Sequence, residues 1–172
     1  MNGAFGLVVT LAVLSGCTAN NDLSVTINRV SPIGVGESIG TVTIGKTSGG
    51  VQFSPDLRDL PPGEHGFHLH EYASCESGEK EGVKIPAMAA GGHYDPEHTG
   101  RHEGPEGRGH LGDLPVLVVD EKGFATTPVV AKRLKMSDLK GRSLMIHAGG
   151  DNYTDNPPMG GGGARIACGV IE

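Results

Sequence analysis

The stretch His65-Gly66-Phe67-His68-Leu69-His70 decides how this sequence folds. Apolar and histidine side chains alternate in it with a period of two, which is typical of a β-strand with two different faces. His68 and His70 therefore share one face and can bind one metal ion together, although such a pair alone also fits a solvated polar face. His65 shares the other face with the two apolar side chains, so we interpret it as a structural histidine held by hydrogen bonds.

Strand-like runs recur along the rest of the chain. The 172 residues include 29 glycines and 11 prolines but no tryptophan, which favours many turns and a core of Val, Ile and Leu. The sequence shows neither an internal repeat nor the pattern of a long helix. It predicts an all-β domain, an antiparallel barrel or sandwich of about eight strands. The runs are residues 23–30, 38–44, 50–54, 64–71, 114–119, 125–131, 143–147 and 165–171.

Two long segments interrupt the strands, residues 72–112 and residues 148–163. Both are rich in glycine, and the first also contains prolines and histidines with little periodicity. A loop of this length without secondary structure of its own is usually functional when it is ordered. The histidines give the first loop something to fold around.

Four potential metal ligands gather near the end of the first loop, within 21 residues, which is dense for histidines scattered over a loop. They are His93, His102, His110 and Asp113. Three imidazoles and one carboxylate form a four-coordinate set that suits a closed zinc site. His147 ends a separate predicted strand and is placed to complete the site of His68 and His70. An all-imidazole set suits Cu(II).

The N-terminus has the features of an export signal. Residues 1–16 carry no charged side chain, and residues 5–14 form an apolar run too short to span a bilayer. Leu14-Ser15-Gly16-Cys17 resembles a lipobox, so we expect a signal peptide over 1–16, a lipidated Cys17 with an anchor and linker over 17–22, and a domain over 23–172. The alternative is an ordinary secretory signal, because the first three residues lack Lys and Arg. Both predict export to the periplasm or cell envelope.

The two remaining cysteines predict a disulfide, and the net charge limits the classes of partner. Cys75 and Cys168 form an even pair, which we expect to be a disulfide in an oxidising compartment, the alternative being two buried thiols. A net charge of -6 argues against nucleic acid as a partner. It does not exclude an anionic substrate, because a local positive field can outweigh the global sign.

Taken together, five motifs resemble the copper/zinc superoxide dismutase family, bacterial periplasmic type, and the resemblance runs from about Leu23 to the end of the chain. It implies an eight-stranded antiparallel Greek-key barrel or sandwich with two long functional loops. It also implies an enzyme that converts superoxide to oxygen and hydrogen peroxide at a redox-cycling copper beside a structural zinc. The motifs are His65-Gly-Phe-His68-Leu-His70-Glu71, Gly91-Gly-His93-Tyr-Asp-Pro, His102-Glu-Gly-Pro, Gly109-His110-Leu-Gly-Asp113 and Arg165-Ile-Ala-Cys168-Gly-Val.

The resemblance also implies a role for each site residue. The copper ligands would be His68, His70, His93 and His147. The zinc ligands would be His93, His102, His110 and Asp113, with His93 shared by both metals. Asp151 would link His68 to His102 outside the ligand shell, and Cys75 and Cys168 would be the family disulfide. The catalytic residues would be Arg165, beside the copper, and His93 as proton donor.

For some residues the sequence alone gives a different interpretation from the family pattern, or the pattern gives none. Arg165 on its own would be interpreted as a solvated surface charge. Residues 149–163 contain no Lys or Arg, so the family's substrate-steering charges do not carry over, and Lys80 and Lys84 are the candidate substitutes. His98 lies outside the motifs, and we expect it on the surface.

Two other functions fit parts of the sequence. A zinc hydrolase would need an open zinc position, which a four-ligand site does not offer. A non-catalytic copper-binding or delivery protein on the same fold would be expected to lack a copper ligand or the arginine, and this chain has both. The expected substrate is superoxide, and the sequence leaves open a monomer or a homodimer.

Overall fold

The computed structural model describes residues 22–172, so the predicted signal peptide and Cys17 lie outside the described residues. Eleven strands and three short 3-10 turns occur in the described part, and no α-helix does. None of the described helices is long and apolar enough to cross a membrane. The elements are β1 (Leu23–Ser31), β2 (Gly34–Thr47), β3 (Gly50–Leu57), β4 (Gly63–His65), β5 (Phe67–His70), β6 (Gly78–Lys80), β7 (Val83–Ile85), η1 (Met88–Ala90), β8 (Leu117–Val119), β9 (Val129–Ala131), η2 (Met136–Asp138), β10 (Arg142–His147), η3 (Pro158–Gly161) and β11 (Arg165–Ile171).

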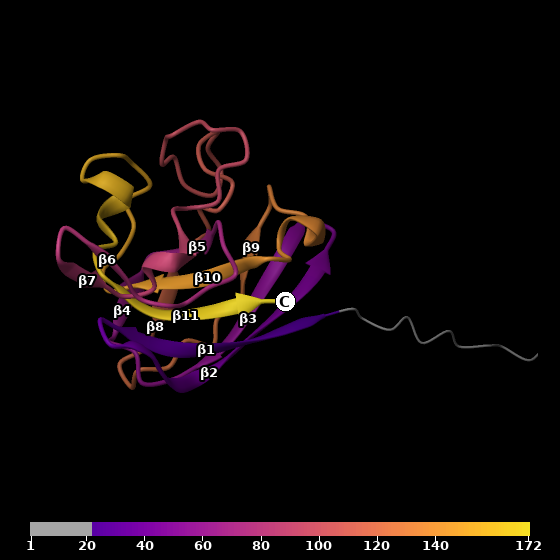
Figure 1. Ribbon diagram of the computed structural model, residues 1–172. Coiled ribbons are helices and arrows are strands. Elements are labelled where there is room, and N and C mark those ends of the chain that lie inside the picture. Colours follow the sequence, from indigo (N-terminus) through magenta and orange to yellow (C-terminus); the bar gives the residue numbers. More distant parts are fainter. Residues whose placement is uncertain (1–21) are drawn as a thin grey trace, which may run out of the picture.

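Seven strands form one antiparallel sheet in the order β5-β10-β11-β1-β2-β3-β9. The last strand, β11, lies between β1 and β10, so the last strand pairs with the first described strand (Figure 1). β4 pairs with β8. Leu57, the last residue of β3, forms an isolated antiparallel bridge with Ala125, which lies between β8 and β9. The predicted all-β antiparallel fold is confirmed. Figure 1 shows the loop before β8 and the loop before β11 projecting from the same side of the strands.

The core lies between the inward faces of these strands and consists mainly of Val, Ile and Leu, as the composition predicts. Phe53 and Phe67 are fully buried and meet edge to face, with ring centroids 5.7 Å apart. A second, smaller cluster surrounds the Cys75–Cys168 disulfide, which is formed as predicted. The disulfide ties the segment after β5 to β11 across 93 residues of sequence.

Besides shifts at the strand ends, two features differ from the strand prediction. The run 64–71 is two strands, because Gly66 separates β4, which pairs with β8, from β5, which pairs with β10. The first long loop contains the hairpin β6–β7, although the sequence predicts no secondary structure there. Its turn residues Glu81 and Gly82 have φ of 54° and 78°. Two positive φ angles in succession give the twist that suits a two-residue hairpin.

Candidate metal centre

Strand pairing brings the histidines of the centre together. β5 carries His68 and His70, and the adjacent β10 ends at His147. The loop before β8 approaches β5 through backbone bridges, from His70 to His93 and from His68 to Asp113. Every predicted metal ligand is at most 7% exposed, so the ring nitrogens need partners inside the protein.

Four histidines form what we call the strand-side group, His68, His70, His93 and His147, with one ligand atom from each lying within 4.8 Å of the others. In three of these rings one nitrogen is held. His68 Nε2 lies 2.7 Å from Asp151 Oδ2, His70 Nδ1 lies 3.0 Å from the Gly91 carbonyl oxygen, and His147 Nδ1 lies 3.1 Å from that of Gly163. The other nitrogen of each ring is buried without a hydrogen-bond partner. Each ring is thus oriented with one nitrogen free for a metal.

A second set converges on one oxygen atom, Oδ1 of Asp113. The three Nδ1 atoms of His93, His102 and His110 lie 2.9, 3.0 and 3.4 Å from it. The Nδ1 atoms of His102 and His110 are buried and make no hydrogen bond in the described structure. We call this set the loop-side group: His93, His102, His110 and Asp113.

His68 also brings a ligand atom within 4.8 Å of those of His93, His102 and Asp113, because its ring stacks on that of His93 with centroids 3.8 Å apart. Its Nε2 is already held by Asp151, so the ring has a single free nitrogen, enough for one ion at most. We therefore place His110, and not His68, in the loop-side group. His93 belongs to both groups, since its Nδ1 faces Asp113 while its ring packs against those of His68 and His70.

Asp151 connects the two groups through its two carboxylate oxygens. Oδ2 lies 2.7 Å from His68 Nε2, and Oδ1 lies 2.7 Å from His102 Nε2. Gly160 has a φ of 70°, and a Cβ there would overlap the Asp151 carboxylate and lie 2.7 Å from His102 Nε2. Only glycine fits at that position, so the second long loop is shaped around this link.

The acid–base state of the two groups differs in the metal-free protein. Burial, followed by the charge of His93, lowers the pKa of His68 to about 3, and burial is also the main cause that lowers the pKa of His147 to about 4. For His102 burial acts in the same direction, but the carboxylates of Asp113, 3.0 Å from Nδ1, and of Asp151, hydrogen-bonded to Nε2, outweigh it and raise the pKa to about 9. The same contacts hold the pKa of both carboxyl groups below its usual range, against the effect of burial. The strand-side rings are therefore neutral near pH 7, the form that a metal requires.

Arg165 lies beside the strand-side group. It is the register partner of His147 in the β10–β11 pair. Its guanidinium donates to the carbonyl oxygens of Ala87 and Gly91, each at 2.6 Å. The Gly91 oxygen also accepts from His70, so a cation and a histidine of the group are held at one atom. Burial lowers the pKa of Arg165.

Comparison with known proteins gives this geometry a family. The family model for copper/zinc superoxide dismutase (SODC) matches residues 38–171. A copper/zinc superoxide dismutase 2 from Salmonella typhimurium strain LT2 is 56% identical over 167 residues, which is 96% of each chain. The chain belongs to the copper/zinc superoxide dismutase family. It is an oxidoreductase that dismutes superoxide, with copper and zinc as cofactors, as the sequence predicts.

Solved structures agree with this assignment. The copper/zinc superoxide dismutase from Brucella abortus shares 52% identity at a TM-score of 0.87, covering 88% of this chain and 100% of that one. The monomeric enzyme from Salmonella enterica shares 58% identity at a TM-score of 0.80, covering 88% and 99%. The fold and the chemistry thus rest on relatives that match nearly the whole described domain.

The enzyme brings all of its predicted metal ligands, Asp151 and Arg165 into one region of the structure. His65 is buried nearby with both ring nitrogens at carbonyl oxygens, 2.7 Å from that of His147 and 2.8 Å from that of Pro61. This agrees with the prediction of a structural histidine. His98 is exposed, also as predicted. Sequence reasoning missed the residues that support the loop from outside it, which are Glu71, Arg133, Tyr153 and Asp155.

Proposed function

We propose that the strand-side group holds the copper and the loop-side group holds the zinc of this superoxide dismutase. The observation that carries the proposal is the set of buried, unpartnered nitrogens on His68, His70 and His147, each fixed by a bond at the opposite nitrogen. An unpaired polar atom in a protein interior is costly, and a metal ion satisfies it. Four imidazoles suit copper, and three imidazoles with a carboxylate suit a closed zinc site.

His93 is the residue that we assign to both metals. Bound copper supplies the one-electron redox chemistry of the reaction, which zinc cannot. The Nδ1 atom of His93 faces Asp113, which leaves Nε2 for the strand-side group. We assign this Nε2 as the atom that holds a proton and passes it to the reduced substrate. The overall reaction consumes two superoxide ions and two protons and yields oxygen and hydrogen peroxide.

Arg165 is the group that we assign to attract and position superoxide. Two of its five N–H donors are used by the carbonyl oxygens of Ala87 and Gly91, and these bonds fix the guanidinium beside His70. Among residues 22–172 the other donors have no hydrogen-bond partner, which leaves them for a small anion. Lys80 and Lys84 are exposed on the β6–β7 hairpin and are our candidates for longer-range steering.

For the compartment, we propose the periplasm or cell envelope, with residues 1–16 removed as a signal peptide and Cys17 lipidated, which leaves residues 17–22 as the linker to the domain over 23–172. The Cys75–Cys168 disulfide supports an oxidising compartment. For the assembly, the monomeric Salmonella enterica relative favours a monomer over a homodimer. Acyl mass at Cys17 in the membrane fraction, and sedimentation of the lipid-free domain, test these two points.

Metal analysis of single variants tests the ligand assignment. His147→Ala should lose copper and retain zinc, because His147 belongs to the strand-side group alone. His110→Ala should lose zinc and retain copper. His98→Ala, an exposed histidine in the same loop as His110, is the control and should retain both. The assignment would be wrong if His147→Ala emptied the zinc site, or if His110→Ala left it full.

A further inference from the structure

Residues 91–116 carry the whole loop-side group, yet outside two isolated bridges they form no strand in the described structure. Their order depends on side chains from elsewhere. Arg133, which follows β9 on the barrel, reaches this loop with its guanidinium. It donates from Nη2 to the Gly109 carbonyl oxygen at 2.7 Å and from Nη1 to that of Gly104 at 3.3 Å.

The two carbonyls lie next to the zinc ligands in sequence and in space. Gly109 immediately precedes His110. The Gly104 N–H points to Oδ2 of Asp113 at 3.3 Å, the carboxylate whose other oxygen faces three histidines. A single guanidinium thus fixes the backbone beside two members of the loop-side group.

Next to the Gly109 carbonyl that Arg133 holds, the segment before His102 touches the segment before His110. The His110 N–H donates to the Arg101 carbonyl oxygen at 2.9 Å, and Arg101 immediately precedes His102. A Cβ on Gly109 would overlap that carbonyl, so the two arms touch here without room for a side chain. Any shift of Gly109 therefore moves His110 relative to His102.

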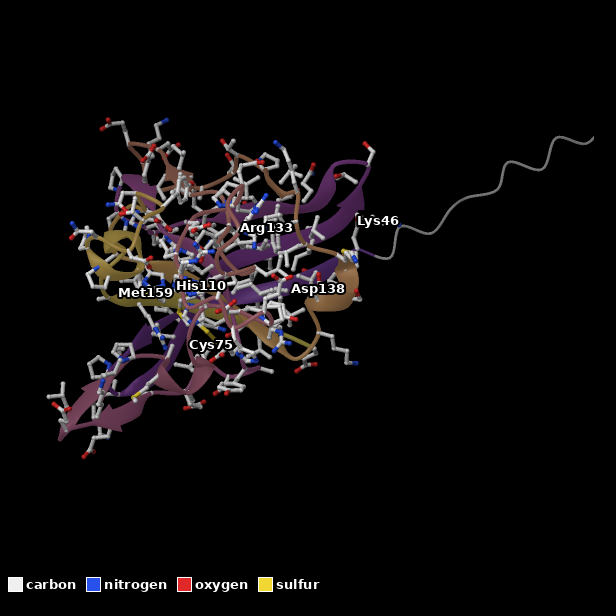
Figure 2. The ribbon with its side chains drawn as sticks, turned by 90° about the horizontal axis from the view of Figure 1, so that it is seen from above. Lys46, Cys75, His110, Arg133, Asp138 and Met159 are labelled. Carbon is white, nitrogen blue, oxygen red and sulfur yellow. A yellow bond between two sulfur atoms is a disulfide. The ribbon has the colours of Figure 1, made fainter. Side chains whose placement is uncertain are left out.

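The second long loop, residues 148–163, also contacts the segment that carries the loop-side group. Asp155 accepts from the His102 N–H at 2.9 Å, and the Tyr153 ring packs on Gly104 so closely that a Cβ there would overlap it. Arg133 comes from the turn after β9, and in Figure 2 Arg133 and Met159 are labelled on opposite sides of His110. The loop-side group thus lies between two supports, the second long loop on one side and Arg133, in the turn after β9, on the other.

We propose that Arg133 is a positioning residue for zinc, which sets the spacing of His102, His110 and Asp113 before the metal binds. The inference rests on the proposed assignment of zinc to the loop-side group. Gly104 and Gly109 are buried, and within residues 22–172 the Gly109 carbonyl oxygen has no hydrogen bond besides that from Arg133. Without the guanidinium this oxygen is left unpaired or turns toward water, which moves His110.

Zinc and copper affinities of the full domain, measured by chelator competition, test the role. Arg133→Met keeps the apolar stem but removes the donors, and it should raise the zinc Kd by about 10- to 100-fold, the usual effect of losing a residue that orients a ligand. Copper affinity, measured on the zinc-free protein, should be unchanged within error. Arg133→Lys keeps the charge but cannot bridge two carbonyls, so its zinc Kd should be intermediate.

Two further measurements separate positioning from general stability. Co²⁺ in the zinc site should have an altered visible spectrum in Arg133→Met, because the histidine and aspartate ligands are displaced. Lys132→Ala is the matched control, since Lys132 adjoins Arg133 and reaches the same loop only through an exposed ion pair with Glu106, 2.9 Å long, and it should bind zinc normally. If Arg133→Met does not fold, Arg133→Lys decides the question.

The possible results are distinguishable. Wild-type zinc affinity in both Arg133 variants, or an equal loss of zinc and copper affinity, would overturn the positioning role. If His110→Ala binds zinc as the wild type does, the zinc assignment itself is wrong, whatever the Arg133 variants do.

Discussion

The two halves of the metal centre are built in different ways. In the strand-side group, His68, His70 and His147 lie on β5 and β10, where ladder hydrogen bonds fix the backbone. In the loop-side group, the side chains lie on a segment without strands, and Asp151 and Arg133 hold them from outside the group. Under the proposed assignment, copper would enter a site made by the sheet, whereas zinc would complete the folding of a loop.

His93→Ala gives the largest expected effect, because His93 belongs to both halves. The variant should lose copper and zinc together. The loss of a shared ligand should exceed that of an outer-shell partner, so dismutase activity should fall by more than about 100-fold. His65→Ala is the control: this buried histidine bonds only to carbonyl oxygens, so the variant should unfold more easily and still hold both metals. Equal metal loss in the two variants would show that His65 is a ligand.

Arg165→Glu separates substrate attraction from metal binding on the strand side. We expect the second-order rate constant to fall by about 10- to 1000-fold while the copper spectrum stays nearly unchanged. Arg165→Lys should retain part of the rate, because it keeps the charge but not the fork of donors. Pulse radiolysis at several ionic strengths measures this, and the wild-type rate should decrease as salt rises. A wild-type rate in Arg165→Glu would mean that another group guides the anion.

The same contrast explains what the sequence could predict. His68 and His70 were predictable because a strand repeats every two residues, and their ladder to β10 keeps that alternation. The hairpin β6–β7 was missed although Glu81-Gly82 is a readable turn. Arg133 and Tyr153 were out of reach, since their contacts cross 29 and 37 residues and leave no spacing pattern.

Arg165 shows a second limit of prediction from sequence. Its charge alone indicates a surface residue, and only the family resemblance placed it beside copper. The structure shows that the carbonyl oxygens of Ala87 and Gly91 hold its guanidinium beside the strand-side group. Carbonyl orientation in a loop is set by tertiary packing, and a single sequence does not display it.

Asp151→Ala tests whether the two halves are coupled, and it should have a smaller effect than the changes above. Asp151 bonds to His68 and to His102, so its loss should weaken both metals by about 10- to 100-fold. Asp155→Ala, on the same loop, should weaken zinc alone, because Asp155 contacts only the His102 backbone N–H in the centre. Chelator competition for each metal measures both. Copper binding that is unaffected in Asp151→Ala would show that the halves are independent.

The two halves should also impose opposite pH dependences on the metal-free protein, the smallest effect that we predict. On the strand side the pKa values of His68 and His147, about 3 and 4, lie below the usual value of 6.5. Between pH 6.5 and 4 the unfolded chain therefore binds more protons, and acid favours unfolding. On the loop side the pKa of His102 is raised to about 9, so its contribution is complete below pH 6.5 and is lost as the pH rises through 9.

Stability of the metal-free domain should therefore be greatest near pH 6.5 and lower on both sides. The acid loss should reach at least about 2 kcal/mol by pH 4.5, a conservative figure for two buried histidines that titrate together. Asp113 and Asp151 do not alter this range, because their lowered pKa values make a contribution that is lost only as the pH falls below the ordinary carboxyl value of 3.8. Urea unfolding at pH 4.5, 6.5 and 9 with chelator present measures the curve. His102→Gln should remove the alkaline decline and leave the acid decline, because only the loop side has a raised histidine pKa; a variant that loses both would mean that one network, and not two differently built halves, sets the response.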